Sequence, residues 1–431
     1  MRNYLLGLLF FTVSSTSLAN QDSDFIAARQ AFQTGNAKAL ENHAKKLQRH
    51  PLRAYVDYYQ LRLVLPTTDS ATIRSFLARY DGSLVADRLR GDWLKVLAKS
   101  QQWPLFDGEH PAVVNKDPEL TCYIYQRRLD LQDTAVIPDA RALWFTSTSL
   151  PDSCTPVFQS LIFKGELPIE DIWTRIRMTL EDGQTSAAMQ ASRYISGDQG
   201  LDLGNLNAAA KNPLRYLEDQ TGKIRTHSDR EIALFALLRL LRNDTDQAFA
   251  QWQKIKDQLT IPDRSYFLAK LGHRAAMRHD TRALSWFKEA QNTTQSYPPS
   301  DTVLGWQVRA ALRVQDWNEV LAAINRMSPT EQQVDTWRYW KARALLATGD
   351  SLSANNMLIP LSKEHSFYGQ LAREELGTLL AISDQTYKVS NGEIAAMEKK
   401  PGVQRTLALS RMNMRIEALR EWSWTIRNFT D

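Results

Sequence analysis

Apolar residues recur at helical spacing along most of this chain, and the pattern is clearest from residue 337 to residue 377. Trp337, Trp340 and Ala344 fall on one face of a predicted helix. A turn at Asp350 interrupts the pattern, and Asp is a residue that suits the start of a following helix. A second apolar run follows the turn. Neither helix can bury its apolar face alone, so this unit predicts neighbours stacked against it.

The same turn recurs through the second half of the chain. An apolar helical run precedes an aspartate in steps of 36, 36 and 34 residues, at Asp244, Asp280, Asp316 and Asp350. A small or branched residue and then a larger apolar one follow each aspartate, which we expect to be the N-cap of the next helix. A fixed period in this range is typical of helix-pair solenoids. The predicted fold class is therefore all-α, an α-superhelix or solenoid of TPR-like helix pairs.

The periodicity weakens outside these repeats. Residues 22 to 105 are interpreted as short, irregular helix pairs, with a separate small domain as the alternative. Residues 378 to 400 lack periodicity and contain turn-forming residues, so the strongest predicted domain boundary lies there. We expect an α-superhelical domain over 20–377 and an incomplete helical linker domain over 378–431.

The first residues have the pattern of an export signal. Arg2 precedes a short apolar run from Tyr4 to Val13, and small residues lead up to Ala19. About ten apolar residues are too few to cross a bilayer, which needs about twenty. We expect a signal peptide over 1–19, cleavage after Ala19, and an exported protein with no transmembrane segment. The alternative is a buried N-terminal helix.

The chain has two cysteines, Cys122 and Cys154. Thiols of exported proteins tend to be oxidised, and two cysteines can pair in only one way, so we expect a disulfide. A bridge closing a loop of this size would contribute about 3–4 kcal/mol. Two separate buried thiols are the alternative. Without a CxxC spacing or a paired histidine, two cysteines are too few ligands for a metal site.

The formal charge of +5 predicts a mildly basic surface that favours anionic partners. The positive residues are dispersed, and no Lys/Arg run compares with a nucleic-acid-binding arm, so we do not expect nucleic acid as a partner.

No motif for catalysis or cofactor binding is present, since HExxH, GxSxG, the Walker loop and GxGxxG are all missing. We therefore expect no cofactor. Three pairs of adjacent carboxylates occur, at Glu170-Asp171, Glu181-Asp182 and Glu374-Glu375. Adjacent side chains on a helix point in different directions, so we interpret these pairs as solvated faces or helix-start charges.

Most tryptophans of the repeats occupy apolar-face positions, where core packing is expected: Trp252, Trp286, Trp337 and Trp340. Trp422 and Trp424 lie on a final helix of which one face would lack a partner if the chain ended there.

Six segments together resemble one known family. They are HPLRAYVDYYQLR (50–62), FLARYDGSLVADRLRGDWLKVLAKSQQW (76–103), SLPDSCTPVF (149–158), WRYWKARAL (337–345), SFYGQLAREELG (366–377) and PGVQRTLALSRMNMRIEALREWSWTIR (401–427). In this order they resemble the soluble lytic murein transglycosylases of Gram-negative bacteria, over nearly the whole chain.

The resemblance implies a long α-superhelix closed into a ring, a helical linker domain, and a lysozyme-like catalytic domain at the end. It also implies periplasmic location and peptidoglycan glycan strands as the partner, with other cell-wall proteins as further partners. Enzymes of this family cleave the MurNAc–GlcNAc bond without water and leave 1,6-anhydro-muramyl ends.

The sequence lacks the motifs that contain the catalytic residues of the family. Neither the Glu-Ser-x-Phe-like motif nor the Ala-Gly-Ala-x-Gly-Leu-Met-Gln-like stretch occurs, so no glutamate here matches the catalytic acid/base. We therefore assign no catalytic residue, and we expect a truncated or split chain that is inactive alone. The alternative is a stand-alone periplasmic helical-repeat scaffold that binds protein partners.

Overall fold

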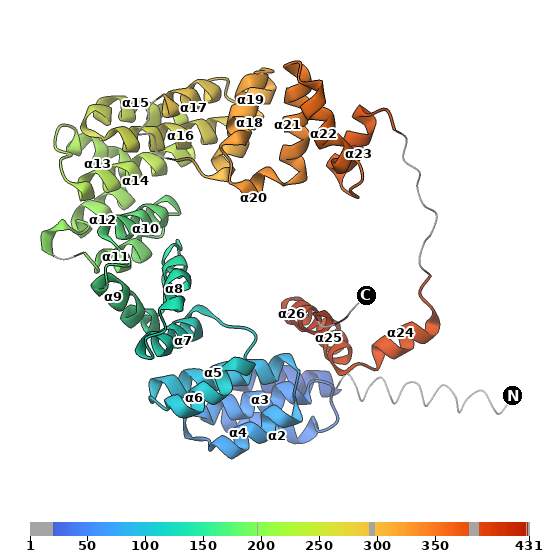
Figure 1. The fold of residues 1–431 in the computed structure, drawn as a ribbon. Coiled ribbons are helices and arrows are strands. Elements are labelled where there is room, and N and C mark those ends of the chain that lie inside the picture. The colour runs from blue at the N-terminus through green and yellow to red at the C-terminus, as the bar shows by residue number, and fades with distance from the viewer. Residues whose placement is uncertain (1–19, 196, 293–297, 379–387, 428, 430–431) are drawn as a thin grey trace. The chain divides into compact units, whose positions relative to one another are not determined.

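The computed structural model describes residues 20–195, 197–292, 298–378, 388–427 and 429 (Figure 1). Every regular element in these ranges is a helix, which confirms the predicted all-α fold. No helix in the same ranges combines the length and the apolar character needed to cross a membrane. The predicted signal peptide over 1–19 lies outside the described residues.

Contacts between residues divide the chain into two compact units. The first unit takes described residues within 1–141, 150–164 and 386–431, and the second takes those within 142–149 and 165–385. The last helices are thus grouped with the beginning of the chain. The expected boundary between a superhelical and a linker domain, and the curvature into a ring, stay predictions.

The second unit consists of helix pairs stacked in chain order (Figure 1). Its helices are α10 (Ile169–Glu181), α11 (Thr185–Ser192), α12 (Leu203–Lys211), α13 (Pro213–Gln220), α14 (His227–Asn243), α15 (Thr245–Ile255), α16 (Ile261–Met277), α17 (Ala283–Gln291), α18 (Asp301–Arg313), α19 (Trp317–Asn325), α20 (Pro329–Gln332), α21 (Asp335–Ala347), α22 (Ser351–Leu361) and α23 (Phe367–Glu375). The long helices α14 and α16 each contact their own partner and the first helix of the next pair, as predicted for a solenoid.

Aspartate caps three of the four predicted turns. Asp244, Asp316 and Asp350 each accept a hydrogen bond of 2.9–3.1 Å from the backbone N–H three residues on. They precede α15, α19 and α22. The N-cap prediction is wrong at Asp280. Its carboxylate accepts from the backbone N–H of Arg282 and pairs with the Arg282 guanidinium, which forms a tighter turn, so α17 begins without a side-chain cap.

The repeat residues form the core of the second unit. Ala248 and Ala354 are fully buried and let neighbouring helices approach closely. Trp252, Trp286 and Trp337 are also buried, as expected, whereas Trp340 is only partly buried, between two apolar clusters.

The first unit begins with a helix over residues 20–33. The helices that follow are α2 (Ala37–Lys46), α3 (Arg53–Val64), α4 (Ser70–Arg79), α5 (Leu84–Lys99), α6 (Trp103–Glu109), α7 (Pro118–Asp130), α8 (Ile137–Trp144, which continues into the second unit), α9 (Thr155–Phe163), α24 (Asn391–Glu398), α25 (Pro401–Arg411) and α26 (Arg415–Ile426). Leu409, Met414 and Ala418 belong to the same apolar core as Phe25 and Tyr55. The α25–α26 pair therefore buries its apolar face against the first helices of the chain.

Ion pairs and a hydrogen bond also connect α25 and α26 to the beginning of the chain. The Arg411 guanidinium pairs with Asp22 at 2.6 Å, and Arg29 pairs with Glu417. The indole N–H of Trp424 donates to the backbone carbonyl of Gly82 at 2.8 Å. Trp424 is thus a buried contact residue, whereas Trp422 is exposed.

Candidate functional site

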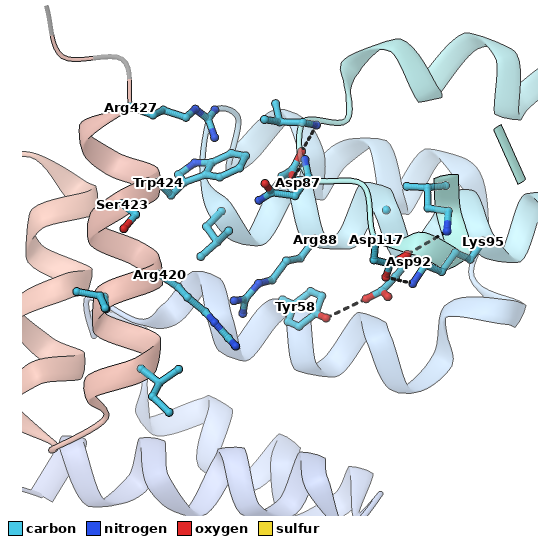
Figure 2. A pocket seen from close by; sticks show the side chains of 17 residues that line it. Tyr58, Asp87, Arg88, Asp92, Lys95, Asp117, Arg420, Ser423, Trp424 and Arg427 are labelled. Carbon is cyan, nitrogen blue, oxygen red and sulfur yellow. Dashed lines mark hydrogen bonds and ion pairs between the residues drawn. The ribbon is translucent and has the colours of Figure 1, made fainter. Parts of the chain in front are cut away.

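A cavity of about 720 Å³ lies within the first unit, between α5, α26 and the segment over residues 113–117 (Figure 2). Tyr58 of α3 forms part of its wall. The helix α26 contacts α5, and Trp424 of α26 donates to the carbonyl of Gly82 just before α5. The cavity therefore lies where α26 meets the early helices. Its lining mixes apolar side chains with charged ones of both signs.

Each of the three carboxylates that line the cavity has a hydrogen-bond or ion-pair partner. Asp87 is buried and accepts hydrogen bonds from the backbone N–H groups of Val114 and Asn115, at 2.7 and 3.1 Å, which hold that segment in place. Asp117 caps α7 and pairs with Lys95. Burial alone would raise the pKa of Asp117, but the bond from Lys95 lowers it overall.

The third carboxylate, Asp92, accepts from the Tyr58 hydroxyl at 2.8 Å and pairs with Arg62 at 2.8 Å. Burial and the charge of Asp92 raise the pKa of Tyr58, and the charges of Arg62 and Arg88 oppose that rise. The Tyr58 phenol therefore stays protonated and serves as a hydrogen-bond donor.

Three arginines line the same cavity: Arg88 from α5, Arg420 from α26, and Arg427 at the C-cap of α26. Within the described ranges none of these three has a carboxylate partner in a salt bridge or hydrogen bond. Arg427 instead lies over the Trp424 ring, 3.2 Å from its centroid. Figure 2 shows the Arg88 and Arg420 side chains directed toward the same part of the cavity, beside Tyr58.

The apolar lining is unusually open to solvent at α26. Ile416 and Leu419 are 66% and 67% exposed, which is high for large aliphatic side chains. Of the two tryptophans for which the sequence left the partner open, Trp424 is buried and Trp422 is exposed, and Ile416 and Leu419 are further exposed apolar residues of this helix. Sequence reasoning missed the site, although the seven-residue spacing of Arg420 and Arg427 could have drawn attention to this helix.

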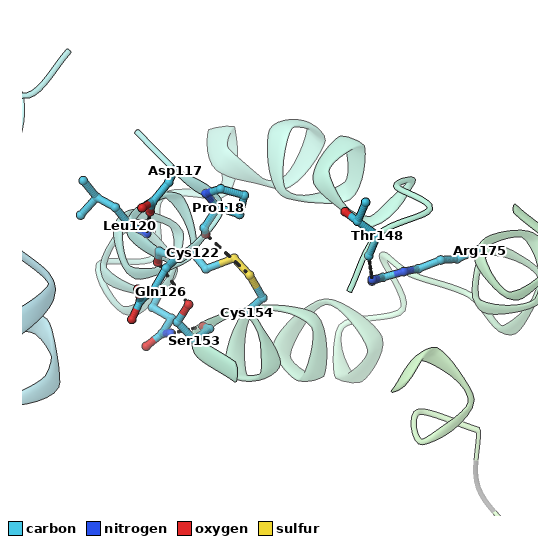
Figure 3. The surroundings of a disulfide bond; sticks show 10 residues. Asp117, Pro118, Leu120, Cys122, Gln126, Thr148, Ser153, Cys154 and Arg175 are labelled. Atoms are coloured by element: carbon cyan, nitrogen blue, oxygen red, sulfur yellow. Dashed lines mark hydrogen bonds between the residues drawn. A yellow bond between two sulfur atoms is a disulfide. The ribbon is translucent and has the colours of Figure 1, made fainter. Parts of the chain in front are cut away.

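The predicted cysteine pair lies near Asp117 and Leu120, two residues that also line the cavity (Figure 3). The structure joins Cys122 of α7 to Cys154 by a disulfide, with 4.9 Å between the Cα atoms and both residues buried. The Ser153 hydroxyl donates to the Glu119 carbonyl at 3.2 Å and ties the same two segments together. Since Leu120 of α7 lines the cavity, the bridge holds one of its walls.

A second polar cluster, in the second unit, surrounds a cavity of about 240 Å³. Arg177 bridges two buried carboxylates, Glu231 and Asp263, at 2.5 Å each. His227 stacks on Trp173 and contacts Glu231 at 3.1 Å. Sequence reasoning missed this cluster because its members come from three different helices.

Asp263 of this cluster does not have the electrostatics of a general acid. Burial alone would raise the pKa of Asp263, but the charge of Arg177 lowers it overall. A carboxyl group that protonates a glycosidic oxygen needs the opposite shift. The cluster is therefore best explained as an ion-pair network that holds α10, α14 and α16 together.

The adjacent carboxylates named from the sequence do not converge on one site. Glu181 accepts from the Tyr266 hydroxyl at 2.8 Å, and Glu375 pairs with Arg343 at 2.5 Å. No group of three or more His, Cys, Asp or Glu side chains in the described part of the chain could hold a metal ion.

No family model matches the chain. Individual known proteins do match it, and they are all soluble lytic murein transglycosylases. The soluble lytic murein transglycosylase of Escherichia coli K12 is 23% identical over 98% of this chain, and that of Salmonella typhimurium is 23% identical over 96%. These alignments cover 66% and 63% of the relatives, so the chain spans just under two thirds of their length.

Solved structures show the same fold. The lytic transglycosylase Slt of Pseudomonas aeruginosa superposes with a TM-score of 0.60 at 24% identity, covering 94% of this chain and 66% of that one. The 70-kDa soluble lytic transglycosylase of Escherichia coli superposes with a TM-score of 0.52 at 21% identity, covering 96% and 66%. The resemblance to soluble lytic murein transglycosylases and the α-superhelical fold class are both confirmed.

Proposed function

We propose that this chain is the non-catalytic, superhelical and linker portion of a periplasmic lytic transglycosylase. Its role is to hold peptidoglycan strands whose MurNAc–GlcNAc bonds are cleaved to 1,6-anhydro-muramyl products. The observation that carries the proposal is the similarity over 98% of this chain, combined with coverage of only 66% of the relative. Export through cleavage after Ala19 and the disulfide between Cys122 and Cys154 belong to the same proposal.

We further propose that the chain is inactive alone. Its sequence contains no counterpart of the family's acid/base glutamate motif. The buried carboxylates Glu231 and Asp263 are both ion-paired with Arg177, and Asp263 is also paired with Arg230, which suits structure better than proton transfer.

A sedimentation assay with purified, insoluble peptidoglycan tests the proposal. Residues 20–431 should pellet with the polymer and release no anhydro-muropeptides detectable by mass spectrometry. Release of such products would overturn the inactivity. A failure to pellet, together with capture of a stoichiometric periplasmic protein, would favour a helical-repeat scaffold that binds protein partners.

A further inference from the structure

The cavity of the first unit has an imbalance of charge. Its carboxylates, Asp87, Asp92 and Asp117, are each held by backbone N–H groups or by a cation. Its arginines Arg88 and Arg420 have no carboxylate to neutralise them among the described residues. A cavity favours an anionic ligand when its guanidinium groups have no carboxylate partner and its carboxylates already have hydrogen-bond or ion-pair partners.

The distance between the arginines indicates how far apart the anionic groups of a ligand would be. Arg420 lies on α26, and Arg427 is the C-cap residue of the same helix, seven positions further on. Because Arg427 keeps helical dihedral angles, the two lie on the same face and about 10 Å apart along the axis. Arg88 faces the Arg420 end, as Figure 2 shows. The cavity therefore offers two cationic positions, one at Arg88 with Arg420 and one at Arg427.

The cavity lining also contains apolar surface. Between Arg420 and Arg427 the helix contributes Ser423 and the ring of Trp424. Leu84, Leu419 and Ile416 line the cavity as well, and the last two are largely exposed. A matching ligand has two anionic groups joined by a partly apolar spacer. In an extended peptide about 10 Å corresponds to three residues. A planar guanidinium binds a carboxylate or a phosphate through two parallel hydrogen bonds, and in a peptide the anions are carboxylates.

We propose that this cavity binds a short peptide through two of its free carboxylates, one held by Arg88 and Arg420 and the other by Arg427. The identity of the peptide rests on the proposed function. The N-acetylated sugars of peptidoglycan are uncharged, whereas its stem peptides of four or five residues carry several free carboxylates. The cavity would thus recognise the peptide, while the glycan strand is held elsewhere on the chain.

The decisive comparison is between charged and uncharged peptides on the full chain. Isothermal titration calorimetry would use a synthetic stem tetrapeptide with free carboxylates and the same peptide with its carboxylates amidated. The free form should bind at least tenfold more tightly, and its affinity should fall as salt is raised. Equal affinity of the two forms, or no binding of the free form at millimolar concentration, would overturn the proposal.

Substitutions locate the site. Arg420→Gln and Arg427→Gln should each weaken binding of the free peptide by roughly tenfold, the size expected for losing a charge-assisted hydrogen bond. Arg415→Gln is the matched control, since Arg415 is exposed on the same helix, carries the same charge and does not line the cavity. All three side chains are exposed, so folding should be unaffected, which circular dichroism checks. An equal loss in all three variants would overturn the site.

Sedimentation with whole peptidoglycan separates this inference from the proposed function. If the R420Q/R427Q double variant loses the tetrapeptide but wild type and variant both pellet, both ideas stand. If the wild type pellets but does not bind the tetrapeptide, the cavity inference fails alone. If the wild type binds neither, the proposed function fails as well.

Discussion

The hydroxyl of Tyr55 donates a hydrogen bond of 2.5 Å to Oε2 of Glu421, a residue 366 positions further along the chain. The other carboxylate oxygen of Glu421 accepts from Nε of Arg405, also at 2.5 Å. Glu421 is fully buried. Burial and the charge of Glu421 raise the pKa of the Tyr55 hydroxyl, which keeps it a donor. This triad connects α3, α25 and α26 inside the core of the first unit.

Replacing Glu421 by Gln should loosen the last two helices. The substitution leaves the largely buried Arg405 without a counter-charge, and breaking a buried pair in this way costs about 3 kcal/mol or more. We expect a lower melting temperature and faster hydrogen exchange in α25 and α26, measured by mass spectrometry.

The surface pair of Arg29 and Glu417 provides the control for that experiment. Both side chains are at least one quarter exposed, so Glu417→Gln should change stability by no more than about 1 kcal/mol. If the two glutamine variants behave alike, Glu421 does not have the structural role inferred for it.

Removing the disulfide should destabilise the first unit. The bridge closes a loop with a sequence separation of 32, so the double variant Cys122→Ser/Cys154→Ser should lose about 3–4 kcal/mol in urea denaturation. A reducing agent should lower the stability of the wild type toward that of the double variant and leave the variant unchanged. A wild type indifferent to reduction would show that the thiols are not bridged in solution.

Acid should weaken the contact between Asp22 and α25. The hydrogen bond from Arg411 lowers the pKa of Asp22 from its ordinary value of 3.8, and a bond from His50 lowers it further, against the opposing effect of burial. A lowered pKa in the folded state means stability that is present above pH 3.8 and is lost as pH falls through the folded-state pKa.

Asp22→Asn should therefore be less stable than the wild type at pH 7, and the difference should shrink below about pH 4. Thermal melting across this pH range measures it. A stability difference that does not change with pH would show that the charge of Asp22 makes no contribution.

Gly402 should tolerate no side chain. A Cβ atom at this position in α25 would collide with the side chain of Thr425 in α26, so Gly402→Ala should force the helices apart and lower the melting temperature. Gly108 in α6 is the matched control, since a Cβ there meets no neighbouring atom. Gly108→Ala should be neutral or stabilising by up to about 1 kcal/mol. Equal effects of the two substitutions would contradict the close approach of α25 and α26.

Local patterns predicted the helices well because a helix is built from neighbours three and four residues apart. The regularly spaced aspartates marked the turns between helices. Only Asp280 did not cap the next helix, because its carboxylate pairs with the Arg282 side chain instead. The cysteine pair left two alternatives open, because spacing in the sequence does not say whether two sulfur atoms meet. The structure brings them together by packing α7 on α9.

The sequence alone determined that this protein is an all-α superhelix of paired helices and that it resembles soluble lytic murein transglycosylases. Both conclusions depend on periodicity and residue order, which are readable along the chain. Only the tertiary structure decided that Glu421 is buried against Tyr55 and that Arg88 shares a cavity with Arg420. Such contacts join residues from opposite ends of the chain, and they depend on which helix faces meet to bury their apolar surface. No local pattern specifies that choice.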